Sequence, residues 1–133
     1  MEGYRRGRHS VSRLCAHLVF VVKYRRRVLL PEHIERMREI AQDVGRHMDF
    51  EVLELNGEPD HVHVLVEYPP KLSISRIVNH LKGVSSRLLR SEYGLNPHTS
   101  HFWSPAYFAA SAGGAPLSII KQYVEQQGNK EPS

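Results

Sequence analysis

The stretch from His61 to Val66 alternates apolar and polar positions, and this pattern constrains the fold more than any other short segment. Three valines occupy one set of alternate positions, and His61, His63 and Leu65 occupy the other. A period of two is typical of a β-strand whose side chains point to two different faces. The pattern therefore predicts a strand with its valines on one face and both imidazoles on the other. By itself it fits either a half-buried strand with polar residues facing water or a site that handles a metal or a phosphate.

The residues before this strand predict a β-hairpin. The sequence FEVLELN at 50–56 favours a strand, and NGEPD at 56–60 consists of residues that tolerate tight turns. Because the histidine strand follows this turn directly, the two strands are expected to pair in an antiparallel way. Two further strands are predicted at 11–24 and 106–112, the second after an irregular loop at 93–105.

Helical spacing of apolar residues predicts three helices. Pro31 lies near the first turn of the first helix, Ser73 can cap the second, and Pro116 begins the third after Gly113 and Gly114. The expected buried stripes are Ile34, Met37, Ala41, Val44 and Met48 in the first helix and Ile74, Ile77, Leu81, Val84 and Leu88 in the second.

This order of elements, β-α-β-β-α-β with a helix after it, is that of an α+β, ferredoxin-like sandwich. The first and third strands of such a fold are the central pair of the antiparallel sheet, and the two helices cover one face. His61 and His63 should then point away from the helices. We expect one domain over 1–133, divided into a basic tail at 1–8, a ferredoxin-like core at 9–112, a C-terminal helix at 115–127 and a flexible tail at 128–133.

Composition narrows the class of protein. The chain has 133 residues, enough to bury a core, and no apolar run long enough to cross a membrane. Cys15 is its single cysteine, so no disulfide can form within the chain, which fits a reducing cytoplasm. The net charge of +4 permits a polyanionic partner without requiring one.

Tyr123 and Gln127 lie four residues apart, so they share one side of the last helix. A tyrosine beside an apolar stripe is usually a core residue with its hydroxyl in water. If this helix instead packs on the open face of the sheet, a phenol and an amide join the two imidazoles. Two imidazoles and an amide oxygen leave a divalent cation its full charge and open positions for phosphate oxygens, so it could polarise a phosphodiester. The set lacks the four ligands of a structural zinc site.

Several segments together resemble the single-tyrosine HUH transposases of the smallest insertion sequences, the insertion-sequence 200 type. The HUH motif is a pair of histidines that flank a bulky hydrophobic residue. The segments are PDHVHVLV at 59–66, IIKQYVEQQ at 119–127, HLVFVVKYRRRVL at 17–29, LKGVSSRLLR at 81–90 and FWSPAYFAASAGG at 102–114. The resemblance runs from about His9 to Gln127, nearly the whole chain.

The resemblance implies a homodimer that cuts and rejoins single-stranded DNA without ATP and recognises DNA hairpins. Tyr123 would be the nucleophile and would hold the 5′ end of the cut strand. His61, His63 and Gln127 would bind Mg²⁺ or Mn²⁺. The resemblance also favours active sites shared between protomers, with the tyrosine helix of one chain facing the histidines of the other.

Residues that would contact DNA are less well defined by the sequence. Arg76, Lys82 and Arg87 in the second helix are candidates, although a solvated charged face is the default interpretation. Four aromatic residues could stack on unpaired bases but are more often packing residues, namely Tyr24, Phe102, Trp103 and Tyr107. His17 is expected to be structural.

Three other interpretations stay open at this point. The chain could be a domesticated or repeat-associated HUH nuclease with the same chemistry. It could be a non-catalytic ferredoxin-like module that binds nucleic acid, although the predicted open face then carries histidines in place of aromatic side chains. It could also be a hydrolytic phosphoesterase that uses its histidines as acid and base and needs no tyrosine.

Overall fold

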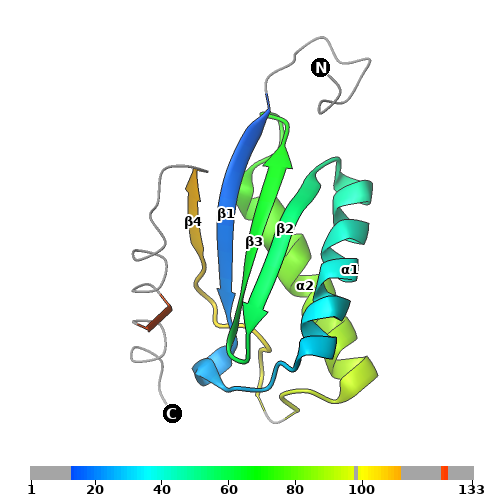
Figure 1. Cartoon of the computed structure of the whole chain (residues 1–133), viewed down its shortest axis with the longest axis vertical. Coiled ribbons are helices and arrows are strands. Elements are labelled where there is room, and N and C mark those ends of the chain that lie inside the picture. The colour runs from blue at the N-terminus through cyan, green and yellow to red at the C-terminus, as the bar shows by residue number, and fades with distance from the viewer. Residues whose placement is uncertain (1–12, 98, 112–123, 126–133) are drawn as a thin grey trace.

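The computed structural model describes residues 13–97, 99–111 and 124–125, and it has a sheet with two helices packed on one face (Figure 1). The strands are β1 (Leu14–Val21), β2 (Glu51–Glu58), β3 (His61–Tyr68) and β4 (Phe108–Ser111), and the long helices are α1 (Pro31–Met48) and α2 (Ile74–Tyr93). The sheet is antiparallel in the order β2-β3-β1-β4. The predicted ferredoxin-like α+β sandwich, with the first and third strands in the centre, is confirmed.

The helix ends follow from local sequence. Pro31 is the first residue of α1, and the backbone N–H of Leu30 before it donates to His33 Nδ1 at 2.9 Å. Ser73 caps α2 as predicted, since its Oγ accepts a hydrogen bond from the Arg76 backbone N–H at 3.2 Å. Gly94 ends α2 in the left-handed conformation with φ of 67°, which glycine adopts without steric cost.

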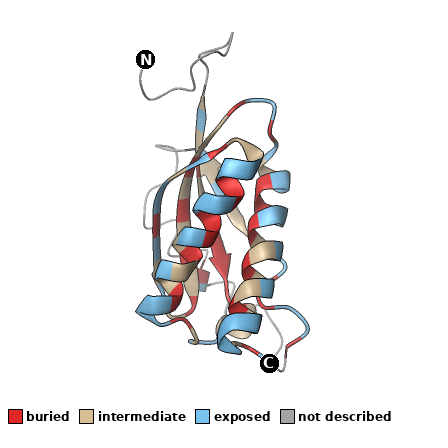
Figure 2. Cartoon of the chain, turned by 90° about the vertical axis from the view of Figure 1, so that its right-hand side faces the viewer, coloured by how far each residue is buried: buried red, intermediate tan, exposed pale blue. Residues whose placement is uncertain are grey.

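The main core lies between the sheet and the two helices. The valines of β3 are fully buried there, and the apolar stripes of α1 and α2 pack against them with some residues only partly buried. Figure 2 shows buried residues on the sides of both helices that face the sheet and exposed residues on their outer sides. The predicted assignment of the β3 valines to the helix-covered face is therefore correct.

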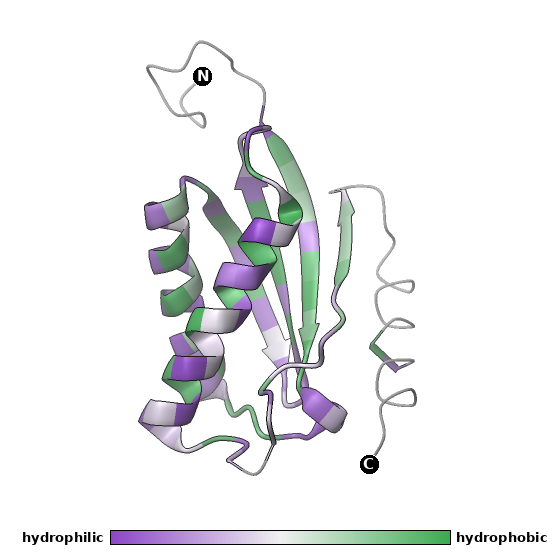
Figure 3. Ribbon diagram, turned by 180° about the vertical axis from the view of Figure 1, so that it is seen from behind, coloured by the Kyte–Doolittle hydropathy of each residue, from purple (hydrophilic) through white to green (hydrophobic). Residues whose placement is uncertain are grey.

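A smaller apolar cluster lies on the other face of the sheet. It consists of Val19 and Val21 from β1 and Val124, with Phe108 packed against it. Val19 is paired with His63 and Val21 with His61 in the sheet register, so these valines share a face with the histidines. Figure 3 shows β1 as a largely hydrophobic strand, in keeping with its burial on both faces.

The structure differs from the sequence-based expectations mainly at the ends of strands. β1 ends at Val21, and Lys23–Arg25 form a short 3-10 turn in which Tyr24 and Arg25 have φ of 60° and 55°. β4 begins at Phe108, two residues later than predicted, after a segment whose carbonyls are bound by Lys82. No described helix combines the length and the apolar character needed to span a bilayer.

Candidate active site

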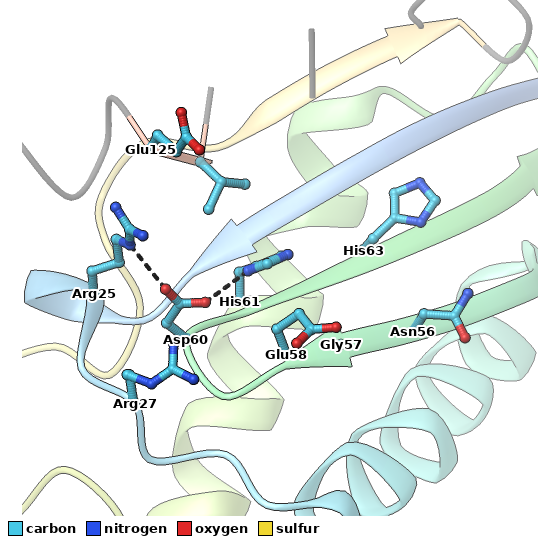
Figure 4. Close-up of a pocket in the computed structure, with 10 residues that line it drawn as sticks. Arg25, Arg27, Asn56, Gly57, Glu58, Asp60, His61, His63 and Glu125 are labelled. Atoms are coloured by element: carbon cyan, nitrogen blue, oxygen red, sulfur yellow. Dashed lines mark hydrogen bonds and ion pairs between the residues drawn. The ribbon is translucent and has the colours of Figure 1, made fainter. Parts of the chain in front are cut away.

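His61 and His63 line a cavity of about 520 Å³ on the face of the sheet opposite α1 and α2 (Figure 4). Both imidazoles are half-buried, as the alternating pattern of β3 predicted. The full lining consists of Arg25, Arg27, Asn56, Gly57, Glu58, Asp60, His61, His63, Val124 and Glu125. The cavity thus brings together two imidazoles, two guanidinium groups and three carboxylates from four separate segments.

His61 is held by a buried carboxylate. Its Nδ1 lies 2.8 Å from Asp60 Oδ1, and Asp60 Oδ2 accepts a hydrogen bond from Arg25 Nε at 2.9 Å (Figure 4). These hydrogen bonds, first from His61 and then from Arg25, outweigh the opposing effect of burial and lower the pKa of Asp60 to about 2. The carboxylate is therefore ionised at neutral pH and can only accept hydrogen bonds.

His63 has a different neighbour. Its Nε2 lies 2.8 Å from His17 Nδ1, and the two rings stack with centroids 4.9 Å apart. Burial lowers the pKa of His63, and the adjacent His17 lowers it further. His63 is consequently neutral near pH 7, the state in which an imidazole can donate a lone pair to a cation. His17 lies on the open face beside the predicted ligands, a placement that the sequence left undecided.

The donor set fits an open divalent cation site in part. The two imidazoles supply nitrogen ligands, but among the described residues no three or more histidine, cysteine and acidic side chains are arranged to hold a metal ion. A cation on His61 and His63 would need a further donor. Gln127, the predicted third ligand, lies outside the described residues, as does Tyr123.

Val124 and Glu125 are the described residues nearest in sequence to the predicted nucleophile. Both are helical, Val124 packs on Val19 and Val21, and both line the cavity that contains His61 and His63. The residue that follows Tyr123 in the chain therefore lies on the histidine face. This is the open face on which the last helix would have to pack for Tyr123 and Gln127 to join the histidines.

The candidate DNA contacts of α2 lie elsewhere. Arg76 and Arg87 are exposed on α2, which packs on the opposite face of the sheet from the histidines. The Lys82 ammonium donates to the backbone carbonyl of Ser104 at 2.6 Å and to those of Pro105 at 3.3 Å and Ala106 at 3.4 Å. Lys82 thus secures the segment before β4, and the structure does not bring these three cations to the cavity.

The aromatic candidates divide into buried and partly exposed residues. Phe102 and Trp103 belong to the main core, where the Trp103 indole N–H donates to Ser85 Oγ at 2.9 Å. Tyr24 and Tyr107 are partly exposed, and each has a cationic side chain over its ring. Of the four aromatic residues, only Tyr24 and Tyr107 are therefore exposed enough to stack on DNA bases.

Sequence reasoning missed the groups that surround the histidines. The sequence places Asp60 in a predicted turn, and Arg25 stands among three consecutive arginines at 25–27 with nothing to mark it out. The only signal for Asp60 was its position directly before the first histidine, where a strand-to-turn junction brings adjacent side chains close. Nothing local in the sequence indicated that Arg25 would reach Asp60, because that contact depends on the 3-10 turn after β1.

The chain is similar to known transposases. The family model described as IS200-like transposase matches residues 10–127. The chain is also 32% identical to the ISDra2 transposase TnpA of Deinococcus radiodurans over 130 residues, which cover 96% of this chain and 93% of that protein. The chain belongs to the IS200-like transposase family. Family membership makes it a DNA-processing enzyme and confirms the resemblance that its motifs indicated.

Other relatives of this IS200-like transposase agree with that assignment. The transposase of insertion sequence element IS200 from Salmonella typhimurium is 31% identical over 114 residues, 84% of this chain and 74% of that protein. A crystal structure of a candidate transposase from Deinococcus radiodurans R1 aligns with a TM-score of 0.81 and 31% identity, covering 92% of this chain and 97% of that one. A REP-associated tyrosine transposase bound to a REP hairpin aligns with a TM-score of 0.58 at 19% identity, over 94% of this chain and 69% of that one, which shows a shared fold.

Proposed function

We propose that this IS200-like transposase cuts and rejoins single-stranded DNA at the ends of an insertion sequence, with Tyr123 as the nucleophile. One observation carries the proposal: the cavity that contains His61 and His63 is bordered by Val124, the residue that follows Tyr123 in the chain. Membership of the transposase family supplies the reaction class. The geometry supports the proposal, because the cavity beside Val124 holds two imidazoles that could act near one phosphodiester.

The proposed reaction is an exchange of phosphodiester bonds. The Tyr123 oxygen attacks phosphorus and forms a new P–O bond while the bond to the 3′ oxygen breaks. The phenolic proton is lost to solvent or a nearby base, and the departing oxygen takes up a proton to become a 3′-hydroxyl. The 5′ end of the DNA stays attached to Tyr123 as a phosphodiester. Because the number of phosphodiester bonds is unchanged, a second 3′-hydroxyl can reverse the step without ATP.

A phenol with an ordinary pKa near 10 is a weak nucleophile at neutral pH, so the reaction needs electrophilic assistance. We propose His61, His63 and Gln127 as ligands of Mg²⁺ or Mn²⁺, and a cation bound there would polarise the phosphodiester as a Lewis acid. The lowered pKa of His63 keeps that imidazole neutral for this role. Arg25 and Arg27 at the rim add positive charge near the place where DNA phosphates would enter.

The proposal extends to the partners of the protein. We propose that it acts as a homodimer on single-stranded DNA that carries hairpins near the element ends. A REP-associated tyrosine transposase with this fold was solved bound to a REP hairpin, and this supports the proposal. Arg76 and Arg87 stay candidates for contacts to the hairpin backbone, and Lys82 is a weaker candidate because its ammonium already binds three carbonyls.

The direct test uses hairpin-bearing single-stranded DNA from the flanks of the gene, incubated with the protein and Mn²⁺ and run on a denaturing gel. We expect a shortened DNA fragment and a slow-migrating band of protein joined to DNA. The Tyr123→Phe variant keeps the ring and should bind the hairpin but give neither product. Cutting without a joined band would indicate a hydrolytic phosphoesterase, and binding without cutting would indicate a non-catalytic module.

A further inference from the structure

Asp60 is a buried carboxylate that touches one proposed metal ligand and one cation. We infer that Asp60, oriented by Arg25, is a positioning residue that keeps the neutral His61 ring protonated on Nδ1 and leaves the Nε2 lone pair for a cation. The inference rests on the proposed role of His61 as a metal ligand. It adds two residues, Asp60 and Arg25, to those that the site requires.

The hydrogen-bond geometry around Asp60 assigns separate partners to its two oxygens. Oδ1 lies 2.8 Å from His61 Nδ1, and Oδ2 lies 2.9 Å from Arg25 Nε. Asp60 is only 4% exposed, so water does not readily replace either partner. An ionised carboxylate has no hydrogen to donate, which means that both partners must donate to it. A neutral His61 can satisfy this contact only with its proton on Nδ1.

The backbone around Asp60 is fixed by the segment that follows β1. The Val22 N–H donates to the Asp60 carbonyl, and the Leu29 N–H donates to the Pro59 carbonyl, both at 2.9 Å. Residues 22–29 therefore wrap around the turn between β2 and β3. These hydrogen bonds fix the backbone position from which the Asp60 carboxylate reaches His61.

Arg25 reaches Asp60 because of an unusual backbone conformation. Tyr24 and Arg25 have φ of 60° and 55°, a backbone region that residues other than glycine rarely adopt. Three hydrogen bonds hold the turn, from the Lys23 N–H to the Phe102 carbonyl at 2.9 Å, from the Arg25 N–H to the Val22 carbonyl at 2.6 Å and from the Arg26 N–H to the Lys23 carbonyl at 3.4 Å. Strained conformations of this kind persist where surrounding contacts fix them, commonly at functional sites. Here the result is a guanidinium placed against Asp60 Oδ2.

The two proposed histidine ligands are therefore oriented in different ways. His63 faces another imidazole, His17, and an imidazole can be either donor or acceptor. His61 faces the Asp60 carboxylate, which can only accept hydrogen bonds. Only the His61 tautomer is imposed by its partner, so the contribution of Asp60 can be tested on His61 with His63 as an internal reference.

The informative substitution is Asp60→Asn, which keeps the shape and changes one acceptor into a donor. Because Arg25 can only donate, it should hold the amide oxygen of Asn on its own side. The amide NH₂ then faces His61 Nδ1, which must become an acceptor. The proton of the neutral ring moves to Nε2, and the lone pair that the cation needs is lost from the cavity.

The measurement is the histidine tautomer in the metal-free protein, read at pH 8 from the ring nitrogen chemical shifts by NMR. We expect Nδ1–H for His61 in the wild type and Nε2–H in Asp60→Asn, with the His63 signals little changed. Mn²⁺ affinity, measured by titration calorimetry, should fall by about 10- to 100-fold, the usual effect of removing a residue that orients a metal ligand. Neither readout depends on DNA cleavage.

Two further variants make the test specific. The double variant with Arg25→Met and Asp60→Asn lacks the group that orients the new amide, so that amide can flip. Part of the Nδ1–H population of His61 and part of the Mn²⁺ affinity should then return. Asp43→Asn is the matched control, since Asp43 also pairs with an arginine, Arg46 at 3.3 Å, but on the exposed side of α1. It should leave the tautomer and the Mn²⁺ affinity unchanged.

The inference is overturned if His61 carries its proton on Nε2 in the wild type, a result that does not depend on any variant folding. It is also overturned if Asp60→Asn keeps both Nδ1–H and the wild-type Mn²⁺ affinity. Failure of the proposed function looks different: the tautomer would follow these expectations, but the wild-type protein would form no covalent product with DNA.

Discussion

His61 and His63 come from one face of one strand, yet their surroundings give them different properties. His61 hydrogen-bonds to the buried Asp60 carboxylate, whereas His63 stacks on His17. Burial and the neighbouring imidazole both lower the pKa of His63. At neutral pH His63 is therefore an uncharged nitrogen donor, and a neutral donor would leave the charge of a bound cation available to a phosphodiester.

Loss of either histidine should separate metal binding from DNA binding. We expect His61→Ala and His63→Ala to abolish cleavage and weaken Mn²⁺ binding, because each removes a nitrogen donor, while hairpin binding persists in gel-shift assays. Gln127→Ala should weaken Mn²⁺ binding less, since a neutral amide is the poorest of the three proposed ligands. Full cleavage by His61→Ala in the presence of EDTA would contradict a metal-assisted reaction.

Asp60 should make part of the fold stability depend on pH. Its pKa is lowered from 3.8 to about 2 in the folded protein, and a group of this kind stabilises the fold above its unfolded pKa and loses that effect as pH falls through the folded value. The pH-dependent part of the wild-type advantage over Asp60→Asn, on the order of 2 kcal/mol from this shift, should therefore be lost between about pH 4 and pH 2. Urea denaturation at several pH values measures it.

The comparison for this experiment is Asp43→Asn, whose aspartate makes an exposed ion pair with Arg46. Exposed pairs contribute little to stability, so the free energy of unfolding of this variant should track that of the wild type across the same pH range. An Asp60→Asn deficit that stays constant from pH 4 to pH 2 would contradict the lowered pKa of Asp60.

At the scale of elements, the order of strands and helices could be predicted because each carries its own period. The valine-histidine alternation of β3 and the apolar stripes of α1 and α2 all face the core as predicted. The end of β1 could not be predicted in this way. Strand-forming residues continue past Val21, but hydrogen bonds from Val22 to Asp60 and from Lys23 to Phe102 end the strand and turn the chain.

In the candidate site, too, some features follow from local sequence and others depend on contacts formed only in the folded chain. The direction of His61 and His63 followed from local alternation, so the sequence predicted it. The contacts of His61 with Asp60 and of Asp60 with Arg25 depend on a turn and a loop that meet only in the folded chain. His17 reaches His63 because β1 and β3 pair in a register that places His17 opposite Leu65, and sequence period alone does not define that register.

The apolar contact of Val124 should matter for cleavage more than for folding. Val124 is 6% exposed and packs on Val19 and Val21 outside the main core. Val124→Ala keeps helix propensity but removes two methyl groups, a loss of roughly 1.5 kcal/mol of apolar contact. We expect cleavage to fall by up to about tenfold, because weaker docking displaces the adjacent Tyr123. Thermal unfolding of the core should change little.

Val124→Ile is the control for this variant, since it keeps an apolar β-branched side chain at the same position. Its cleavage rate should stay close to that of the wild type. If Val124→Ala also cleaves at the wild-type rate while hairpin binding is intact, the contact with Val19 and Val21 has no part in assembling the active site.

At the scale of the molecule, the two faces of the sheet have different roles. The helices α1 and α2 close one face, and the opposite face carries the histidine cavity and the patch formed by Val19 and Val21. In the described chain Val124 packs on its own sheet. If active sites are shared in a homodimer, as predicted, the helix of a second protomer would have to take the place of Val124 on this patch.

A mixed dimer tests whether sites are shared. Tyr123→Phe and His61→Ala should each be inactive alone. When the two chains are co-expressed with different tags and the mixed dimer is purified, shared sites would give one complete site and one that lacks both groups. Cleavage should then return to about half of the wild-type level per dimer. A purified mixed dimer that binds hairpin DNA but never cuts it would show that each chain builds its own site.

The most direct test of the central claim is to map the residue that becomes joined to DNA. After reaction with single-stranded DNA and digestion with nuclease and trypsin, mass spectrometry should find a residual nucleotide on the peptide from Gln122 to Lys130, in which Tyr123 is the only tyrosine. We predict a phosphodiester from Tyr123 to the 5′ side of the cleaved strand. Cut DNA with an unmodified peptide, or a nucleotide on any other residue, would contradict the proposed function.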